Sequence, residues 1–333
     1  MEENIMAIVM AAGKGTRMKS KKSKLVQKIY GKEIVLRAVQ NVRKSGIDDI
    51  VVIVGYMKEE VMSVLENNFN YAFQEEMLGT GHAVMQATKY LEGKKGKVLV
   101  VNGDVPILKP DTLKNFINKS IKNAESATLL TAIYNDAKGY GRIVRNAKGN
   151  VEKIVEDKDC NTEEKQIKEI NAGIYCFDIE NLLEALKEMK PNNAQKEYYL
   201  TDVIKIMNDK GLKIGAVIVE DNTEILGIND RVQLEMLIKV YQQRVNTEYM
   251  KNGVTIEDIN TTYIYDDVKI GVDTVIHPNT TIKENVKIGE DCEIGPNVYI
   301  EENCVLKDNE KVANTLLKNR INWKINKYMI SKF

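Results

Sequence analysis

The sequence contains no long apolar segment and no excess of charge of either sign. Apolar runs such as Ile50–Val54 and Val98–Val101 are short, whereas a membrane-spanning helix needs about 20 apolar residues. The 48 basic and 48 acidic side chains balance, so no bulk field attracts nucleic acid. The N-terminal stretch MEENIMAIVM is acidic where a secretory signal peptide is basic. We therefore expect a cytoplasmic protein that has neither a membrane nor a nucleic acid as partner.

Cysteine and histidine are scarce, which limits the available chemistry. None of the four cysteines belongs to a CxxC pair, which disfavours a zinc site, and a reducing cytoplasm disfavours structural disulfides. A Cys–His nucleophile pair would need residues far apart in the sequence. An enzyme built on this chain is therefore expected to work without a side-chain nucleophile. The cysteines are Cys160, Cys176, Cys292 and Cys304, and the histidines are His82 and His277.

The composition is that of a globular protein with two or three domains, because 43% of the 333 residues are apolar and 29% are charged. Strand and helix patterns alternate up to about residue 225, which predicts an α/β, Rossmann-like domain with helices on both faces of its sheet. Short β segments between residues 127 and 178 indicate an antiparallel part, so the sheet should be mixed. The predicted strands include Ile5–Met10, Ile50–Val54 and Val98–Val101, and the predicted helices include one with Val35, Val39 and Val42 on one face and one over 81–91.

The C-terminal third has a different period. A connecting helix is predicted over about 230–250, ended by Gly253, because apolar residues recur there at three- and four-residue spacing. Beyond it, aliphatic residues recur every six positions, with a small or β-branched residue four places after each of the first seven. A parallel β-helix with three flat faces gives this period, and Gly271, Gly289 and Gly295 suit its corners. The aliphatic residues are Ile264, Ile270, Ile276, Ile282, Ile288, Ile294, Ile300 and Leu306.

The repeat is expected to stop at Leu306, and a tail follows. From Lys311 onward this tail holds six basic and no acidic residues, interleaved with apolar ones. It could form a membrane-surface helix. The alternative, which we favour, is a helix that packs on the open end of the β-helix or on a neighbouring subunit.

The loop after the first strand has the features of a phosphate-binding loop. Gly13 and Gly15 let backbone N–H groups approach a phosphate, and a following helix would present its positive N-terminus. Met18 stands where a dinucleotide fingerprint has its third glycine, and the GK[ST] ending of a P-loop is missing. The basic residues that follow suit a triphosphate. Among them we expect Arg17 and Lys24 to act on phosphates, and Lys19, Lys21 and Lys22 to be solvated.

Asp104 follows a predicted buried strand, at the edge where open α/β sheets bind ligands. A lone aspartate there can be a turn residue. Beside a phosphate loop it becomes a candidate ligand of Mg²⁺, which takes one or two protein oxygens together with substrate phosphates.

These residues belong to a longer series of motifs that resembles the bacterial N-acetylglucosamine-1-phosphate uridyltransferases, which form the N-terminal half of a bifunctional enzyme. The resemblance covers about residues 5–306. Its motifs are Met10–Met18 with Lys24, Gln74, Leu78–Ala83, Asn102–Pro106, Gly139–Ile143, Val155–Asp159, Glu169–Gly173, Asn193–Asp202 and Gly227–Arg231.

The resemblance implies roles for individual residues. Arg17 and Lys24 would bind phosphates as catalytic residues, and Asp104 and Asn229 would bind Mg²⁺ as cofactor. Gln74 and Gly81 would read the uracil, and Thr80, Gly141, Glu156 and Asn171 would line the sugar site. The further substrate-binding residues would be Ala11, Ala12, Gly13, Gly79, Asn102, Gly103 and Tyr199. Read from the residues alone, Asn229 would pass as a helix N-cap.

The resemblance also implies the domain organisation: a nucleotidyltransferase domain (1–228), a connecting helix (229–253), a short left-handed parallel β-helix (254–308) and a basic amphipathic tail (309–333). Packing of β-helices side by side, as in the family, would give a homotrimer. Two departures from the family pattern concern single residues: Ser23 stands where a proline is usual, and Lys196 where a glycine is usual. The family's longer β-helix acetylates glucosamine 1-phosphate. Because eight hexapeptides make fewer than three coils, we expect no acetyltransferase activity here.

The function expected from the resemblance is uridylyl transfer from UTP to N-acetylglucosamine 1-phosphate, with release of pyrophosphate. Transfer to another sugar 1-phosphate, or from another nucleotide, remains an alternative. A regulatory homologue without turnover and an acyltransferase are alternatives of other classes, and the short repeat with His277 as its one histidine argues against the latter.

Overall fold

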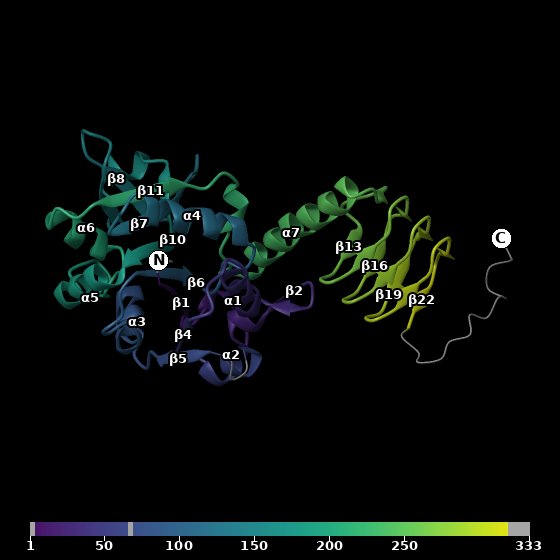
Figure 1. The fold of residues 1–333 in the computed structure, drawn as a ribbon, viewed down its shortest axis with the longest axis horizontal. Coiled ribbons are helices and arrows are strands. Elements are labelled where there is room, and N and C mark those ends of the chain that lie inside the picture. The colour runs from purple at the N-terminus through teal and green to yellow at the C-terminus, as the bar shows by residue number, and fades with distance from the viewer. Residues whose placement is uncertain (1–3, 66–68, 319–333) are drawn as a thin grey trace. The chain divides into compact units, whose positions relative to one another are not determined.

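The computed structural model describes residues 4–65 and 69–318, and these form two compact units (Figure 1). The first unit comprises residues up to Gln27 and Glu33–Leu234. The second comprises Lys28–Lys32 and the chain from Glu235 onward. The assignment of residues 28–32 to the second unit departs from the continuous first domain that the sequence predicts.

A nine-stranded mixed sheet forms the centre of the first unit. Its main order is β11-β7-β10-β6-β1-β4-β5, β8 pairs with β10, and β9 pairs with β8. β1, β4, β5 and β6 are parallel, whereas β10 runs antiparallel to β6 and β7, which confirms the predicted mixed sheet. The strands are β1 (Ile5–Ala11), β4 (Ile50–Val54), β5 (Asn70–Phe73), β6 (Lys97–Asn102), β7 (Ala127–Ile133), β8 (Arg142–Arg145), β9 (Val151–Val155), β10 (Glu169–Asp178) and β11 (Ile214–Ile218).

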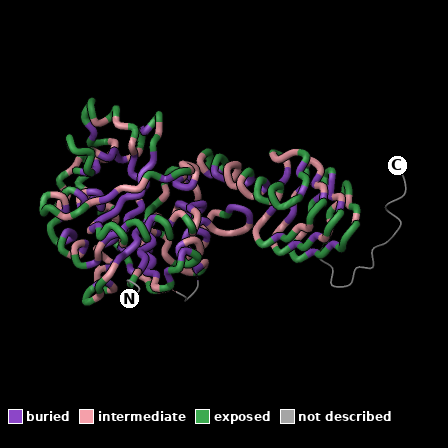
Figure 2. Tube along the Cα trace, turned by 45° about the horizontal axis from the view of Figure 1, so that its top comes forward, coloured by how far each residue is buried: buried purple, intermediate pink, exposed green. Residues whose placement is uncertain are grey.

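Helices cover both faces of this sheet because its central strands are apolar on both sides. Met6 and Ile8 of β1 pack in one cluster with α3, α5 and α6, and the alternate residues Ala7 and Val9 are buried as well. α1 contacts α2 and α4. Figure 2 shows the buried residues running through the centre of this unit. The helices are α1 (Ile34–Lys44), α2 (Lys58–Leu65), α3 (Thr80–Met85), α4 (Pro110–Lys122), α5 (Ile179–Glu188) and α6 (Asp202–Asp209), with 3₁₀ turns η1 (Thr16–Met18), η2 (Lys24–Val26), η3 (Thr88–Tyr90), η4 (Glu164–Gln166) and η5 (Asn222–Ile225).

Two expectations about helices in the first unit were wrong. The glycine-rich loop leads into the three-residue turn η1, not into a full helix, because Gly15 and Lys19 on either side of it are both left-handed. The first α-helix begins only at Ile34. The helix predicted over 81–91 is divided into α3 and η3.

The second unit contains a parallel β-helix, as the period of six predicts. Its strands form three parallel sheets, and each strand pairs with the one a coil further along the chain. The inward aliphatic residues are buried, with Ile264, Ile282 and Ile300 at 0% exposure. The strands are β12 (Thr255–Ile256), β13 (Thr262–Ile264), β14 (Lys269–Ile270), β15 (Val275–Ile276), β16 (Thr280–Ile282), β17 (Lys287–Ile288), β18 (Glu293–Ile294), β19 (Val298–Ile300), β20 (Val305–Leu306), β21 (Lys311–Val312) and β22 (Leu316–Leu317).

The repeat continues past the boundary at 308 that the sequence predicts. β21 pairs with β18, and β22 pairs with β19, so the first part of the predicted tail is another stretch of the coil. Val312 and Leu317 occupy the inward position, and both are packed against the β-helix core. Val312 keeps the period of six, but Glu310 stands where the earlier repeats have a small or β-branched residue. The loop after β21 is one residue short, so Leu317 falls out of the period. The rest of the predicted tail, 319–333, lies outside the described residues.

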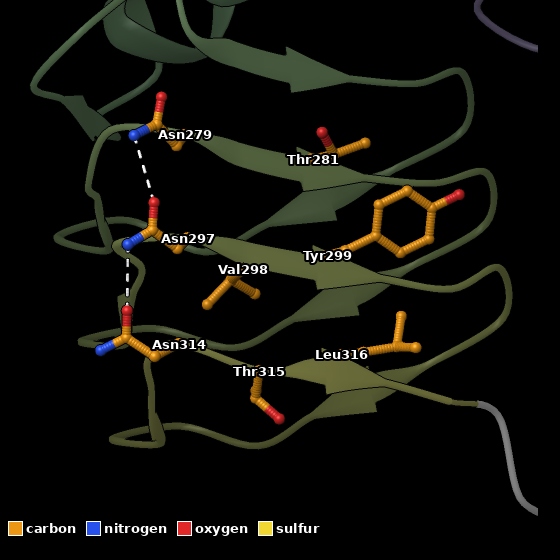
Figure 3. A pocket seen from close by; sticks show the side chains of 8 residues that line it. All are labelled: Asn279, Thr281, Asn297, Val298, Tyr299, Asn314, Thr315 and Leu316. Carbon is orange, nitrogen blue, oxygen red and sulfur yellow. Dashed lines mark hydrogen bonds between the residues drawn. The ribbon is translucent and has the colours of Figure 1, made fainter.

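A second period of six marks the corners of the coil. Eight Asn or Asp residues at intervals of six have φ between 55° and 63°, the left-handed region that short polar side chains tolerate best. Of the three glycines expected at corners, Gly295 alone has a positive φ. Figure 3 shows two residues of this row and the later Asn314: Asn279 Nδ2 donates to Asn297 Oδ1 at 3.2 Å, and Asn297 Nδ2 donates to Asn314 Oδ1 at 3.0 Å. The eight residues are Asp267, Asp273, Asn279, Asn285, Asp291, Asn297, Asn303 and Asn309.

The helix α7 (Arg231–Lys251) covers the beginning of the β-helix with its second half. Gln242 and Asn246 are buried and donate to the carbonyls of Ile259 and Thr262. Tyr249 packs on the β-helix core. The beginning of the apolar coil is therefore covered by this helix, whereas the predicted packing of the tail on the other end concerns residues 319–333 and stays a prediction. Among the described residues, no helix combines the length and the hydrophobicity needed to cross a bilayer.

Candidate active site

The topology of the sheet gathers the predicted residues at one edge. β1, β4, β5 and β6 end at the same edge because they are parallel. β10 is antiparallel and pairs Tyr175 with Val100, so its first residues lie beside the end of β6. Asn102 Nδ2 donates to the Gly173 carbonyl at 3.4 Å across this junction. Open α/β sheets bind ligands at such an edge.

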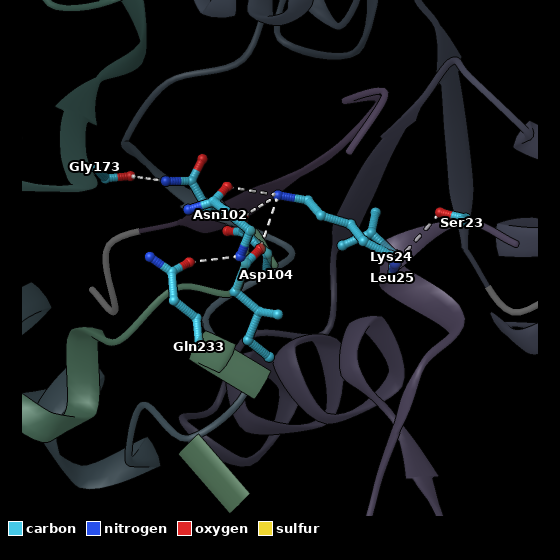
Figure 4. A network of polar contacts seen from close by, with 9 residues as sticks. Ser23, Lys24, Leu25, Asn102, Asp104, Gly173 and Gln233 are labelled. Atoms are coloured by element: carbon cyan, nitrogen blue, oxygen red, sulfur yellow. Dashed lines mark hydrogen bonds and ion pairs between the residues drawn. The ribbon is translucent and has the colours of Figure 1, made fainter. Parts of the chain in front are cut away.

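Lys24 lies at the centre of a first cluster of predicted residues (Figure 4). Its Nζ atom is 2.5 Å from Oδ2 of Asp104 and 3.4 Å from Oδ1 of Asn229. It also donates to the carbonyl of Ile228 at 3.2 Å. Asp104 follows β6, Lys24 belongs to η2 and Asn229 precedes α7, so the fold brings together residues that are far apart in the sequence. Two oxygen side chains thus converge on one cation.

The donor set of this first cluster fits Mg²⁺. Carboxylate and amide oxygens are hard ligands, and magnesium needs only one or two of them when phosphates and water complete its shell. Among the described residues, no group of three or more His, Cys, Asp or Glu side chains forms a metal-binding cluster. Asp104 and Asn229 would therefore hold the ion with the help of substrate oxygens.

The environment of Asn229 also decides against the helix-cap alternative. The cap of α7 is Asp230, whose Oδ1 accepts from the backbone N–H of Gln233 at 2.8 Å. Gln233 in turn accepts from the backbone N–H of Asn229 at 2.8 Å. This arrangement is a variant of the capping box in which the second bond comes from the residue before the cap, and it leaves the Asn229 amide to face Lys24.

Lys24 is supported by its own surroundings. A Cβ atom on Gly15 would lie 3.0 Å from Lys24 Cγ, so the glycine-rich loop packs directly on the lysine stem. Ser23 is buried, and its backbone N–H donates to Glu60 Oε2 at 2.9 Å. The proline that is usual in the family could not make this bond.

The structure separates the basic residues differently from the prediction. Lys19, Lys21 and Lys22 are exposed, as expected. Arg17 in η1 is exposed too, so the geometry distinguishes Lys24 but not Arg17 from the solvated lysines. Gly13 lies in the open part of the loop, with no atom within 4 Å of the place where a Cβ would stand.

A second cluster surrounds Gln74, which is 4% exposed and follows β5. Its Nε2 donates to the Gly79 carbonyl at 3.0 Å and lies 3.2 Å from His82 Nδ1. The backbone N–H of Gly81 donates to the Tyr198 carbonyl at 2.7 Å. Side chains at Gly79 or Gly81 would collide with Tyr198 and Met189, so these glycines allow two chain segments to touch.

A third cluster lies beside β10, where Asn171 meets Gly141 and Glu156. A Cβ atom on Gly141 would lie 3.5 Å from both Asn171 Cβ and Glu156 Oε2. Asn171 Nδ2 donates to Tyr175 Oη at 2.7 Å, which fixes the amide. Glu156 accepts from Thr201 Oγ1 at 3.2 Å.

Burial shifts the acid–base behaviour of this third cluster. Desolvation raises the pKa of Glu156, and the charges of Asp159, Asp202 and Asp157 add to the effect, while the bond from Thr201 opposes it. Desolvation also raises the pKa of Tyr199 to about 12. Tyr199 is 8% exposed, and its hydroxyl has no hydrogen-bond partner among the described residues. A buried hydroxyl of this kind is suited to a polar ligand.

The three clusters are connected. The backbone N–H of Leu200 donates to Thr80 Oγ1 at 3.0 Å, which joins the second cluster to the third. Ala12, in the loop after β1, lies near the second cluster, because a Cβ atom on Gly55 would lie 3.0 Å from Ala12 Cβ and 2.8 Å from the Gln74 carbonyl oxygen. Gly103 N–H donates to the Met10 carbonyl at 2.9 Å, next to the buried Ala11. Except for the exposed Arg17 and Gly13, the predicted residues thus take part in one continuous region.

Sequence reasoning missed several supporting residues. Gln233, Tyr175 and Thr201 orient Asn229, Asn171 and Glu156, and His82 lies between Gln74 and Gln86. The Asp230–Gln233 spacing of a capping box could have revealed Gln233. Asn171 and Tyr175 are only four positions apart, but such a spacing within a strand is no recognised signal, and the Thr201–Glu156 bond joins residues 45 positions apart.

Comparison with known proteins agrees with the class that this fold and site define, a nucleotide-binding transferase. Residues 6–253 match the family described as nucleotidyl transferase, so the chain belongs to this family. Residues 273–308 match the bacterial transferase hexapeptide family (six repeats). Both matches confirm the resemblance inferred from the motifs.

Relatives and a solved structure extend this result. "Bifunctional protein GlmU" of Acetivibrio thermocellus is 52% identical over 278 residues, which are 84% of this chain and 60% of the relative. "Bifunctional protein GlmU" of Clostridium botulinum (strain Eklund 17B) is 46% identical over 95% of this chain and 67% of the relative. The chain thus spans about 60% of the length of the first of these relatives. A putative glucose-1-phosphate thymidylyltransferase from Bacillus anthracis, solved with sucrose, shares the fold with a TM-score of 0.59 and 20% identity over 71% of this chain and 95% of that one.

Proposed function

We propose that the protein transfers a uridylyl group from UTP to N-acetylglucosamine 1-phosphate and releases pyrophosphate, with Mg²⁺ as cofactor. The observation that carries the proposal is the position of the Lys24 ammonium between the oxygens of Asp104 and Asn229. An ammonium and two hard oxygen donors at the ligand-binding edge of a nucleotidyltransferase sheet are suited to polyphosphate chemistry.

The reaction needs no general base. The attacking group is a sugar phosphate whose second pKa is near 6, so it is mostly dianionic at pH 7. The barrier comes from bringing anions together and aligning them for in-line displacement at the α-phosphorus. When bound, Mg²⁺ supplies charge neutralisation at the phosphate oxygens.

Residues of the chain itself bind the phosphates, the sugar and the uracil. The Lys24 ammonium carries three N–H donors, so it can donate to a phosphate as well as to Asp104, and its charge then stabilises the transition state. Arg17, exposed in η1, can reach a phosphate from the solvent side. Glu156, Asn171 and Tyr199 supply polar groups for the sugar and its amide, and Gln74 with Gly81 supplies the polar edge for uracil.

A pyrophosphate-release assay tests this function with each of the four NTPs against N-acetylglucosamine 1-phosphate, glucosamine 1-phosphate and glucose 1-phosphate. With UTP, we expect kcat/KM for N-acetylglucosamine 1-phosphate to exceed that for glucose 1-phosphate by about 100-fold or more. Glucose 1-phosphate lacks the amide, so it would leave buried polar groups of the site without partners. Equal values for the two sugars would contradict the named substrate. No turnover with any pair would favour the regulatory alternative.

We further propose a homotrimer in which β-helices pack side by side. An open hollow of about 510 Å³ on the β16-β19-β22 face supports this proposal (Figure 3). Tyr299 and Leu316 on this face are 41% and 49% exposed, and apolar side chains of this size gain from burial in an interface. Sedimentation equilibrium of the wild type and of Tyr299→Glu would test it.

Acetyl transfer to glucosamine 1-phosphate is not expected from these 333 residues. His277 lies on the β-helix with Nδ1 2.8 Å from Glu257 and Nε2 3.3 Å from Glu293, so both ring nitrogens already face carboxylates. Measurable release of CoA from acetyl-CoA would contradict this proposal. We also place the reaction in the cytoplasm, which is in line with four free, buried cysteines.

A further inference from the structure

The hairpin at residues 28–33 has an unusual turn. β2 (Lys28–Ile29) and β3 (Lys32–Glu33) are joined by Tyr30 and Gly31, whose φ angles are 47° and 81°. Two successive positive φ values are the pattern of a type I′ turn, which favours Asn-Gly or Asp-Gly. A bulky tyrosine is strained in this conformation. Its presence indicates that the ring itself is needed.

The Tyr30 ring is buried in a cluster of tyrosines in the second unit. Its centroid is 5.5 Å from that of Tyr241 on α7, 5.0 Å from Tyr265 and 6.3 Å from Tyr263 on β13. Tyr30 is 6% exposed. These separations are those of favourable aromatic pairs. The turn is thus anchored both to the β-helix and to the helix that precedes it.

Two further contacts hold the hairpin in place. Lys32 Nζ is 3.2 Å from Asp266 Oδ2 and 3.1 Å from Asp267 Oδ2. Tyr241 Oη donates to Asp266 Oδ1 at 3.0 Å, so Asp266 joins the hairpin to α7. A Cβ atom on Gly31 would lie 1.5 Å from Glu284 Oε1, so any other residue would displace the Glu284 carboxylate and would also be strained at a φ of 81°.

Both anchored segments start from residues of the candidate active site. The hairpin begins after Gln27, whose backbone N–H donates to the Lys24 carbonyl at 3.2 Å and whose carbonyl accepts from Ile34 N–H at 2.9 Å. α7 begins directly after Asn229 and Asp230. Lys24 and Asn229 therefore lie just before two segments, the hairpin and α7, and these two segments contact each other through Tyr30 and Tyr241.

We propose that Tyr30 is a positioning residue, which holds the Lys24 loop and the Asn229 loop in register through its contact with Tyr241. The inference rests on the proposed function for its kinetic consequence. Tyr30 does not touch substrate. Tyr30 restricts the movement of the loop that carries the Lys24 ammonium and of the loop that carries the Asn229 amide. Both groups can then act on the same phosphate group.

Kinetics of Tyr30→Ala, Tyr30→Phe and Tyr241→Ala in the full chain provide one test. We expect Tyr30→Ala to lower kcat by about 10- to 100-fold, since small misplacements of catalytic groups cost this much. KM for the sugar phosphate should stay within about twofold, because the third cluster is untouched. The half-saturating Mg²⁺ concentration should rise. Tyr30→Phe should keep the wild-type kcat and the wild-type half-saturating Mg²⁺ concentration. The Tyr30→Ala/Tyr241→Ala double variant should show no larger fall in kcat than either single variant.

Hydrogen exchange provides a test that does not depend on turnover. Peptides that end before Lys28 and peptides covering 226–233 should exchange faster in Tyr30→Ala than in the wild type, with matched control Tyr299→Ala unchanged. If Tyr30→Ala fails to fold, Lys32→Ala weakens the same anchor and should give the same pattern with a smaller change.

The outcomes distinguish the two proposals. A wild type without pyrophosphate release contradicts the proposed function, and the exchange pattern then still decides the role of Tyr30. A folded Tyr30→Ala variant with wild-type kcat and unchanged exchange at both peptides overturns the inference. A rise in KM without a fall in kcat would also overturn it, because it would indicate a substrate contact.

Discussion

The ammonium of Lys24 and the carboxylate of Asp104 lie 2.5 Å apart, with 12% and 20% of their side chains exposed. Lys24 therefore competes with any divalent cation for the same carboxylate. This competition gives the pair an effect on metal affinity as well as on the chemical step.

We predict that Lys24→Ala lowers kcat by about 100-fold or more, because a positioned charge on the transferring phosphate is lost. The same variant should bind Mg²⁺ more tightly, because the internal competitor is removed. Pyrophosphate release and calorimetric titration with Mg²⁺ measure the two effects. Lys19→Ala is the matched control and should change neither. Near-normal turnover in Asp104→Ala would refute the role of both residues.

Glu156→Gln should separate stability from activity. The folded pKa of Glu156 lies above its unfolded value because of burial, so its contribution to stability is present below the unfolded pKa and is lost as pH rises through the folded pKa. At pH 8 the variant should therefore melt at a higher temperature than the wild type, and the difference should shrink as pH falls toward 5.

The same Glu156→Gln variant should lose at least about tenfold in kcat/KM for the sugar phosphate, since a charged acceptor is replaced by a neutral amide. Glu152→Gln, on the exposed side of β9, is the control for both measurements. A variant with unchanged kcat/KM would show that the carboxylate does not face the sugar.

The β-helix should depend on pH through His277. The hydrogen bond to Glu257 raises the pKa of His277, and the bond to Glu293 adds to this although partial burial opposes it. The stabilisation is fully present below the unfolded pKa of about 6.5 and disappears as pH rises through the folded pKa.

His277→Gln should therefore reduce the free energy of unfolding at pH 5.5 and have no such effect at pH 9. The loss should stay below about 1 kcal/mol, because both glutamates are nearly half exposed. Urea unfolding at the two pH values measures it. In a Glu257→Gln/Glu293→Gln background the substitution should have little effect at either pH, and an undiminished effect there would contradict the ion-pair explanation.

Lys196 has a left-handed backbone, with φ of 55°, at a position where the family usually has glycine. Lys196→Gly should remove a strain of about 1 kcal/mol, partly offset by the greater freedom of glycine in the unfolded chain. A small rise in Tm is expected. Lys190→Gly is the control: Lys190 precedes Pro191 and has no positive φ, so glycine there should lower Tm.

The sequence allowed prediction of features with a local or periodic cause. The period of six from Ile264 gave the β-helix, and the placement of Asp104 after an apolar strand gave the ligand-binding edge. The Asn and Asp residues at the corners recur as regularly as the isoleucines. Their role as left-handed corner residues follows from their φ angles, which the amino-acid sequence does not reveal. The coil past Leu306 escaped prediction because Glu310 interrupts the series of small residues and the last loop is one residue short.

Other features could not be predicted because their causes are non-local. The hairpin of β2 and β3 lacks the Asn-Gly signal, since Tyr30 is retained for contacts with residues more than 200 positions away. The bond from Lys24 to Asp104 joins residues 80 positions apart. Motif resemblance named both residues, but only the fold explains why they meet.

The left-handed corners give the β-helix a modular length. Each coil of three hexapeptides returns the chain to the same face, so removal or insertion of 18 residues between equivalent corners, such as Asp273 and Asp291, leaves every later strand on its own sheet. Removal of six residues would instead turn all later residues onto the neighbouring face. Evolution and engineering can therefore change the reach of this domain in whole-coil steps without redesigning the core.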